Sequence, residues 1–296
     1  MGKRLRENIS DENSFILKNE RCPFLNDDNL CDIIINCGES GLCQICRDHP
    51  RFFNWYGDIK EGGIGLSCQE GARLILTTDS VSFDESEVCE EPESVDEELF
   101  KLLYFAREEM FGIIDSEDKT LCQCLCECLD FAHRLQFFVD NPHLSQADFS
   151  LSESPVQCDT VNEMLRMFGE TEPIDESWTK QYESLLEFTF MGEVSFDIVS
   201  QRYLKNIFRY FIYRYFLDGV FYEEILSRVK FAAVSVIVIA LMTGGKNDIE
   251  TWIEKSKLYS KQMEYSDENR ALFYDKSYEM ECFDCSAIKE VIKKMF

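Results

Sequence analysis

Positive charge is scarce in this sequence. The sequence has 30 lysines and arginines but 56 aspartates and glutamates, which gives a formal net charge of −26 at pH 7. Such a chain repels the phosphates of nucleic acids at long range, so we expect no nucleic-acid partner. The surplus of carboxylates would instead attract a basic side chain or a basic protein surface. An acidic surface without any specific partner is the simpler explanation of the same charge.

Long apolar runs are also missing. The first ten residues, MGKRLRENIS, contain no apolar core of the kind that a secretory signal peptide needs. The most apolar run, residues 231–242, is about a dozen residues long and falls short of the roughly 18 that span a bilayer. We therefore expect a buried core helix there, no membrane span, and a cytoplasmic protein.

Two sequence signatures of cofactor binding are absent as well. The glycines at 62–65 do not have the G-x-G-x-x-G spacing of a nucleotide loop, and no βαβ pattern surrounds them. They are more typical of a turn. The C-x-x-x-C-x-x-C signature of radical enzymes does not occur either. The residues alone therefore reveal no nucleotide-binding site.

Cysteine, in contrast, is abundant, with 14 residues. Disulfides are rare in the cytoplasm, so these cysteines point to metal binding for some and to apolar packing for others. Cys43 and Cys46 form a C-x-x-C pair, whose two thiolates can turn toward one ion. The surrounding stretch is rich in glycine and too small to be held together by apolar burial alone. A metal ion that staples this stretch is therefore a physical expectation.

The spacing of the cysteines in this stretch predicts one metal centre. The predicted ligands are Cys22, Cys31, Cys43, Cys46 and Cys68, with Cys37 as an additional cysteine beside Gly38. Ligation by thiolates alone suits either an iron–sulfur cluster or zinc, and the spacing does not choose between them. His49 follows the C-x-x-C pair closely, and we expect it to lie outside the ligand shell.

The remaining cysteines fit a structural role better. Cys122 and Cys126 share one face of a predicted helix, whereas Cys124 and Cys128 share another. Four ligands of one ion cannot come from two faces, so we expect small apolar core residues. Cys282 and Cys285 form a second C-x-x-C without a partner pair nearby, which predicts ordinary core or surface thiols.

The sequence predicts a mainly α protein, with a small cysteine-rich metal-binding module followed by a helical domain. The expected parts are an N-terminal tail (1–20), the module (21–78), an acidic linker (79–98) and the helical domain (99–296).

Capping patterns predict where several helices begin and end. Ser94 and Glu97 have the spacing of a capping box, and the helix that they open would bury Leu99, Leu102, Leu103, Ala106 and Met110. Asp115 and Ser116 are candidate caps of the next helix, which would run to about residue 139. Further helices are expected near 159–168, 178–190, 197–219, 221–243 and 248–262. Gly244-Gly245 predicts a helix end, and Asp248 predicts the following cap.

Several segments resemble one known family. Three contain cysteines of the module: RCPFLNDDNLC (21–31), GLCQICRDHPRF (41–52) and GLSCQEGARLIL (65–76). Two lie far downstream: YFIYRYFLDGVF (210–221) and KLYSKQMEYSDEN (257–269). In this order they resemble the flagellin lysine-N-methylase family, over nearly the whole chain. The family usually has a further cysteine motif upstream of CPFL, which this sequence lacks. That departure predicts a shortened or divergent member.

The resemblance implies transfer of a methyl group from S-adenosylmethionine to lysine side chains of flagellin, with an iron–sulfur cluster in the cysteine module. The lysine must be neutral to act as a nucleophile, so an enzyme must lower its pKa or supply a base. The candidate catalytic residues are Tyr259, Glu264 and Tyr265. Arg47 and Arg51, beside the C-x-x-C pair, are the candidates for binding the donor.

A non-catalytic metal-binding protein is the alternative. Its cysteine module would be a structural zinc or cluster site, and its helical domain would bind a partner. This alternative predicts loss of folding on chelation and no binding of the donor. The methylase predicts methyl incorporation that requires both the donor and an intact cluster.

Overall fold

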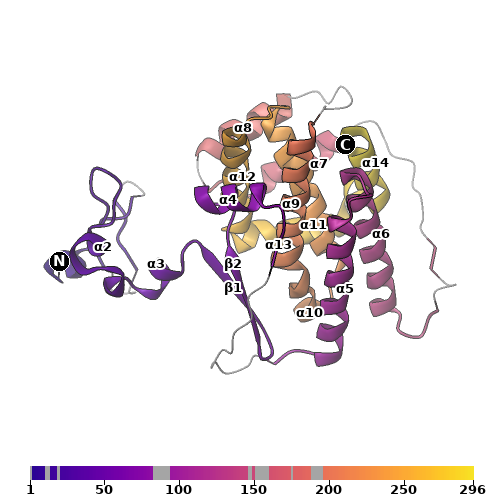
Figure 1. Ribbon diagram of the computed structural model, residues 1–296, viewed down its shortest axis with the longest axis horizontal. Helices are drawn as coiled ribbons and strands as arrows, with labels where there is room; N and C mark the ends of the chain where they lie inside the picture. The colour runs from indigo at the N-terminus through magenta and orange to yellow at the C-terminus, as the bar shows by residue number, and fades with distance from the viewer. Residues whose placement is uncertain are drawn as a thin grey trace. The chain divides into compact units, whose positions relative to one another are not determined.

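The computed structural model describes residues 2–10, 14–18, 21–82, 94–145, 149–150, 160–174, 176–187 and 196–296. The chain divides into two compact units, Met1–Phe52 (unit 1) and Phe53–Phe296 (unit 2) (Figure 1). The predicted fold class is confirmed: helices dominate the described residues, whose only sheet is a two-stranded hairpin. The division between the units falls inside the stretch 21–78 that the sequence predicts as one module.

Unit 1 contains only short helices. They are α1 (Gly2–Glu7), α2 (Asp32–Cys37), η1 (Glu39–Gly41) and α3 (Gln44–Asp48). The first residues, expected to be a tail, fold back onto the cysteine segment. The Arg4 guanidinium forms an ion pair with Asp32 and donates to the Pro23 carbonyl, both at 2.5 Å. The rings of Phe15 and Phe24 meet edge to face at 5.2 Å.

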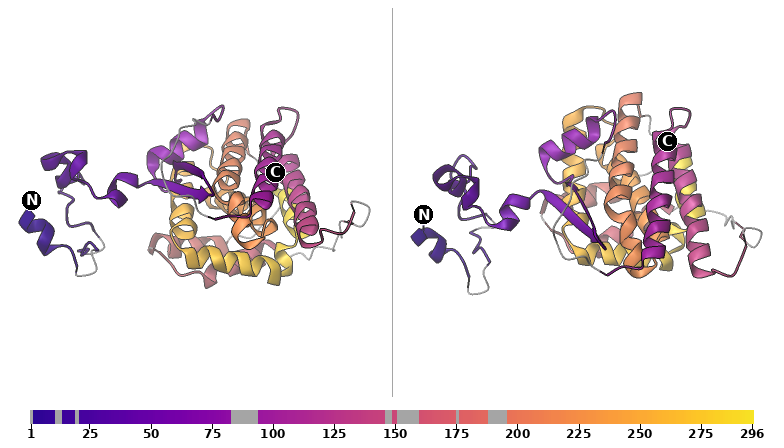
Figure 2. Two further views of the ribbon diagram at one scale, coloured as in Figure 1. Left: turned by 90° about the horizontal axis from the view of Figure 1, so that it is seen from below. Right: turned by 60° about the horizontal axis from the view of Figure 1, so that its bottom comes forward.

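Unit 2 consists of a hairpin and a bundle of helices, shown from two further directions in Figure 2. Its elements are β1 (Arg51–Tyr56), which begins at the end of unit 1, β2 (Ile59–Ile64), α4 (Gln69–Thr77), α5 (Glu97–Asp115), α6 (Leu121–Asp140), α7 (Thr160–Met167), η3 (Phe168–Glu170), α8 (Glu176–Glu187), α9 (Ile198–Tyr215), η4 (Phe216–Asp218), α10 (Gly219–Tyr222), α11 (Leu226–Thr243), α12 (Ile249–Glu264), α13 (Asp267–Glu279), η5 (Glu281–Phe283) and α14 (Cys285–Met295).

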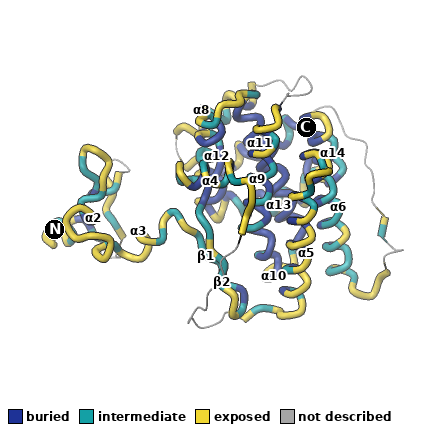
Figure 3. Tube along the Cα trace, in the orientation of Figure 1, coloured by how far each residue is buried: buried dark blue, intermediate teal, exposed yellow. Residues whose placement is uncertain are grey.

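Helix α11 is the centre of the core. All its residues are buried, and it packs against α9, α6, α12, α13 and α14 (Figure 3). It is long and apolar enough to cross a membrane, but its whole length lies inside unit 2. The expectation of a buried core helix over 231–242 is therefore confirmed. The buried ammonium of Lys230 donates to the Ser277 carbonyl at 2.6 Å, so this polar group is satisfied inside the core.

The predicted starts of two helices are wrong by a few residues. Asp96, not Ser94, caps α5, because its carboxylate accepts from the amides of Glu98 and Leu99 at 3.0 and 2.9 Å. Helix α6 begins with a capping box between Thr120 and Gln123, since α5 itself continues through Asp115. Two other predicted signals are confirmed: the helix end at Gly244, which has φ of +58°, and the cap at Asp248.

The buried face of α5 also differs from the prediction. Leu99 is only half-buried and Leu102 is 46% exposed, whereas Arg107 is buried. Two guanidinium nitrogens of Arg107 donate to both carboxylate oxygens of Glu61 on β2, at 2.7 and 2.6 Å. This pairing allows an arginine to occupy the inner face, which hydrophobic periodicity alone does not predict.

The cysteines of α6 follow the prediction of two faces. Cys124 and Cys128 are fully buried, whereas Cys122 and Cys126 are half-buried on another face. The Cys124 thiol donates to the Ile113 carbonyl at 3.3 Å. The interpretation of Cys124 and Cys128 as core residues is therefore confirmed, and Cys282 and Cys285 are buried as well. Cys89 and Cys158 lie outside the described residues.

The start of α11 generates a stability prediction. This helix has no side-chain cap of its own, and Gln136 of α6 takes that place. The Gln136 Oε1 atom accepts from the amides of Ile225 and Leu226 at 2.7 and 3.0 Å. Gln136→Leu leaves both buried amides without a partner, so we expect the free energy of unfolding to fall by about 2–3 kcal/mol. Denaturant unfolding measures this.

Gln181→Leu, at a half-buried glutamine of α8, is the matched control. Equal stability of the two variants would show that Gln136 does not cap α11.

Candidate functional site

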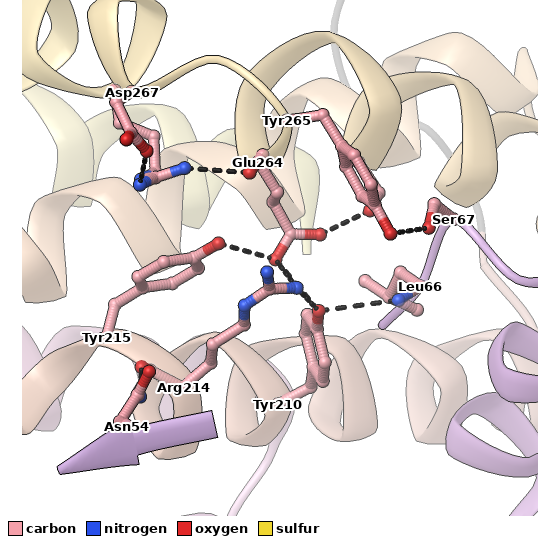
Figure 4. Close-up of polar contacts among 11 residues, drawn as sticks. Asn54, Leu66, Ser67, Tyr210, Arg214, Tyr215, Glu264, Tyr265 and Asp267 are labelled. Atoms are coloured by element: carbon pink, nitrogen blue, oxygen red, sulfur yellow. Dashed lines mark hydrogen bonds and ion pairs between the residues drawn. The ribbon is translucent and has the colours of Figure 1, made fainter. Parts of the chain in front are cut away.

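Three segments, 65–76, 210–221 and 257–269, meet at one place in unit 2. Leu66 and Ser67 precede α4, Arg214 lies near the end of α9, and Glu264 and Tyr265 lie at the end of α12. Figure 4 shows Tyr210, Arg214 and Tyr215 pointing toward the Glu264 carboxylate, with Leu66 beside Tyr210 and Ser67 beside Tyr265. The segments are far apart in the sequence, so only the fold brings them together.

The Glu264 carboxylate is the centre of this cluster, and its side chain is fully buried. Its Oε1 atom accepts from the hydroxyls of Tyr210 and Tyr215 at 2.8 and 2.9 Å, and from the Arg214 guanidinium at 2.9 Å. Its Oε2 atom accepts from the Ser260 hydroxyl, one helical turn earlier on α12. Four donors therefore compensate the loss of water around a buried negative charge.

The protonation states of the partners support this arrangement. Burial raises the pKa of both Tyr210 and Tyr215, and the nearby Glu264 charge raises it further, so both hydroxyls keep their protons and donate them. Burial by itself lowers the pKa of Arg214, but Glu264, Tyr210 and Tyr215 together outweigh this effect, and the pKa lies well above its ordinary value. Arg214 therefore stays charged opposite Glu264.

Further hydrogen bonds attach the turn before α4 to the cluster. The Tyr210 hydroxyl accepts from the Leu66 amide at 3.3 Å, and the Ser67 hydroxyl donates to the Tyr265 hydroxyl at 2.7 Å. From the other side, Asn54 of β1 donates to the Arg214 carbonyl at 2.9 Å. The cluster therefore fixes the hairpin, the turn and two long helices relative to one another.

The candidate catalytic residues have different surroundings. Tyr259 is fully buried, its hydroxyl lies 2.8 Å from the Ser235 hydroxyl, and its ring contacts those of Phe168, Trp178 and Phe211. Glu264 is buried as described above, and Tyr265 is 45% exposed. The contacts of Tyr259 and Glu264 are those of residues that stabilise a core. A role of either residue in proton transfer stays a prediction.

Four of the predicted metal ligands lie in unit 1. Burial raises the pKa of the Cys46 thiol to about 11, and the nearby thiols of Cys43, Cys22 and Cys31 add to this. Four sulfurs are the donor set that zinc or an iron–sulfur cluster takes. In the part of the chain that the structure describes, no group of three or more potential ligands has the geometry of a preformed metal site.

Cys68, the fifth predicted ligand, belongs to unit 2 and has a local role there. It caps α4, and its sulfur accepts from the Gly71 amide at 3.4 Å. Gly71 itself is constrained, because a Cβ atom at this position would lie 2.8 Å from the Gly65 carbonyl oxygen. The spacing predicts Cys68 as a ligand and the run 70–76 as the first turns of a helix, but the sequence does not show that the Cys68 sulfur caps this helix.

The two candidate donor-binding arginines are both exposed. Arg51 donates to the Arg47 carbonyl at 3.0 Å, one turn before it. Tyr210, Arg214 and Tyr215 are not among the predicted site residues, although all three lie in the segment 210–221. Their aromatic and basic character is typical of a helix surface, and nothing local to that segment shows that a glutamate 49 to 54 residues downstream joins them.

The buried ion pair generates a second prediction. Glu264→Gln keeps the shape of the side chain but leaves Arg214 buried without a counter-charge, so we expect a loss of about 3–5 kcal/mol in the free energy of unfolding. The matched control is Glu254→Gln on the same helix, where the glutamate side chain is 69% exposed and pairs with Lys255. The control should change stability by less than about 0.5 kcal/mol. Equal stability of the two variants in urea would contradict a structural role of Glu264.

The thiols of unit 1 generate a third prediction, about protons. With a pKa of about 11, the metal-free Cys46 thiol is protonated at neutral pH. A metal ion binds the thiolate, so binding must release this proton and the apparent affinity must rise with pH. Calorimetric titration with zinc in two buffers of different ionisation enthalpy measures the release. Equal heats in both buffers would show that these thiols do not bind the ion.

Comparisons of the chain with protein-family models, with curated proteins and with solved structures found no match.

Proposed function

We propose that this protein is a lysine N-methyltransferase that acts on flagellin, takes its methyl group from S-adenosylmethionine, and holds an iron–sulfur cluster in unit 1. The observation that carries the proposal is the convergence on Glu264. The resemblance rests in part on the segments 65–76, 210–221 and 257–269, and these three segments contact one another in one hydrogen-bonded cluster. If the three segments form one buried site, a common role at that site accounts for the family resemblance in each of them.

The four thiols of Cys22, Cys31, Cys43 and Cys46 fit a cluster by number and by donor chemistry. When bound, an iron–sulfur cluster supplies one-electron chemistry and a rigid anchor for the loops around it. The residues of this chain bind the metal and position the elements around the site. The thiolates hold the metal, and the Glu264 cluster fixes α9, α12 and the turn before α4. The acidic surface attracts a basic substrate segment in the cytoplasm.

A non-catalytic metal-binding protein is the second candidate. The observation that favours it is the burial of Tyr259 and Glu264, whose polar atoms are engaged within the core. On this alternative the thiols of unit 1 bind zinc or a cluster for stability alone, and unit 2 binds a partner.

The test uses full-length protein purified without oxygen. We expect iron with matching sulfide, and incorporation of labelled methyl groups from S-adenosylmethionine into flagellin lysines. Cys43→Ser and Cys46→Ser should lose both the metal and the methyl transfer, because each removes one of four ligands. Cys37→Ser, at an exposed cysteine of the same unit, is the matched control and should keep both.

Metal-replete protein that binds no donor and transfers no methyl groups would refute the methyltransferase and support the second candidate. Retention of full metal content by Cys46→Ser would refute the ligand assignment in either case.

A further inference from the structure

Unit 2 contains a groove that neither the thiols nor the Glu264 cluster uses. It lies between the turn of the β1–β2 hairpin and the first turns of α5, and its volume is about 840 Å³. This size is in the range of pockets that bind small molecules or peptide side chains. Aromatic rings form much of its lining, namely those of Tyr56, Phe100, Tyr104 and Phe105.

The aromatic wall is held in place from behind. The Tyr56 ring stacks between those of Phe100 and Phe221, with centroid distances of 5.7 and 5.8 Å. Its hydroxyl donates to the half-buried carboxylate of Asp218 at 2.7 Å, which restrains the ring. Tyr104 packs beside Phe100 at 6.1 Å. Tyr56 and Phe100 therefore form a buried backing of the groove, and the ring surface open to a ligand is that of Phe105 and part of Tyr104.

The chemistry of the groove favours a cation. Ring faces carry partial negative charge and attract ammonium and guanidinium groups. Tyr104 already receives the Arg107 guanidinium at 5.3 Å from its ring centroid. The charged groups of the lining are Asp58, Glu97 and Lys101, and Lys101 pairs with Glu97 at 3.4 Å. The Asp58 charge is therefore uncompensated within the lining, on a chain whose net charge is −26.

The apolar part of the groove specifies the ligand further. Phe105 is 68% exposed at the groove, on a helix whose opposite side is buried in the core. A lysine side chain combines an apolar stem with a terminal charge, so its stem can lie on the rings while its ammonium reaches a carboxylate. A small inorganic cation would leave the rings unused, and an anion would be repelled by Asp58.

We propose that this groove binds a lysine side chain, together with its neighbouring residues, from a basic polypeptide segment. This inference rests on the proposed function and names the subsite at which that substrate is recognised. The lysine stem lies against Tyr104 and Phe105, and its ammonium lies near Asp58.

Calorimetric titration of the full-length, metal-replete protein tests the inference. The probes are a lysine-containing peptide of flagellin, the same peptide with norleucine at the lysine, and S-adenosylhomocysteine. We expect the norleucine peptide to bind about tenfold more weakly, because it keeps the stem and loses the charge. Added salt should weaken the lysine peptide and not the norleucine peptide.

Two variants with matched controls locate the binding. Phe105→Ala should weaken the lysine peptide about threefold, and Asp58→Asn should weaken it by a similar factor at low salt. Leu102→Ala is the control for the first, because Leu102 is an exposed residue of the same helix outside the groove. Glu108→Gln, at an exposed carboxylate of α5 outside the lining, is the control for the second. Both controls should bind as the unaltered protein does.

Several results would overturn the inference. One is equal affinity for the lysine and norleucine peptides. Another is that Phe105→Ala and Asp58→Asn bind the lysine peptide as tightly as the unaltered protein does. A third is that the lysine peptide does not bind, whereas S-adenosylhomocysteine binds and Phe105→Ala weakens its binding.

The inference and the proposed function can fail separately. Lysine-dependent binding at the groove without any methyl transfer would refute the methyltransferase and support the groove as a lysine-binding site. Methyl transfer with the same KM for flagellin in Phe105→Ala and in Leu102→Ala would support the methyltransferase and refute the groove as the lysine subsite.

Discussion

The burial of one negative charge organises unit 2. Glu264 lies at the end of α12 with no exposed side-chain surface, and a carboxylate in that position is costly unless charge and hydrogen bonds compensate it. Arg214 provides the charge, and the hydroxyls of Tyr210, Tyr215 and Ser260 provide most of the hydrogen bonds. Because these donors have fixed directions, they also fix how α9 and α12 meet. An apolar contact would allow more than one alignment of the helices.

Two other polar contacts of unit 2 work in the same way. Arg107 on α5 pairs with both oxygens of Glu61 on β2, and Gln136 on α6 completes the start of α11. Each contact joins elements that are separate in the sequence and is largely shielded from water. The core around α11 supplies the bulk of the apolar burial, whereas these three contacts specify the register in which helices and hairpin pack on it.

The thiols of unit 1 present a different physical situation. This unit has short helices and few buried apolar side chains, so it gains little free energy from burial. Cys22, Cys31, Cys43 and Cys46 lie in this unit, and their proposed metal would supply the cohesion that the small core does not. The described lining of the groove at the hairpin turn comes from unit 2 alone. A substrate subsite there and a metal centre in unit 1 are therefore separate proposals, joined only by the proposed reaction.

Sequence by itself determined the features that act over one or two helical turns. The mainly α class, the caps at Asp248 and Gly244, the two cysteine faces of α6 and the buried helix over 231–242 follow from local hydrogen bonding and from periodicity. The inner position of Arg107, the cap by Gln136, the position of Cys68 in unit 2 and the cluster at Glu264 were decided only by the tertiary structure. A charged or polar side chain is buried where a distant partner compensates the loss of water, and the sequence pattern around it does not contain that partner.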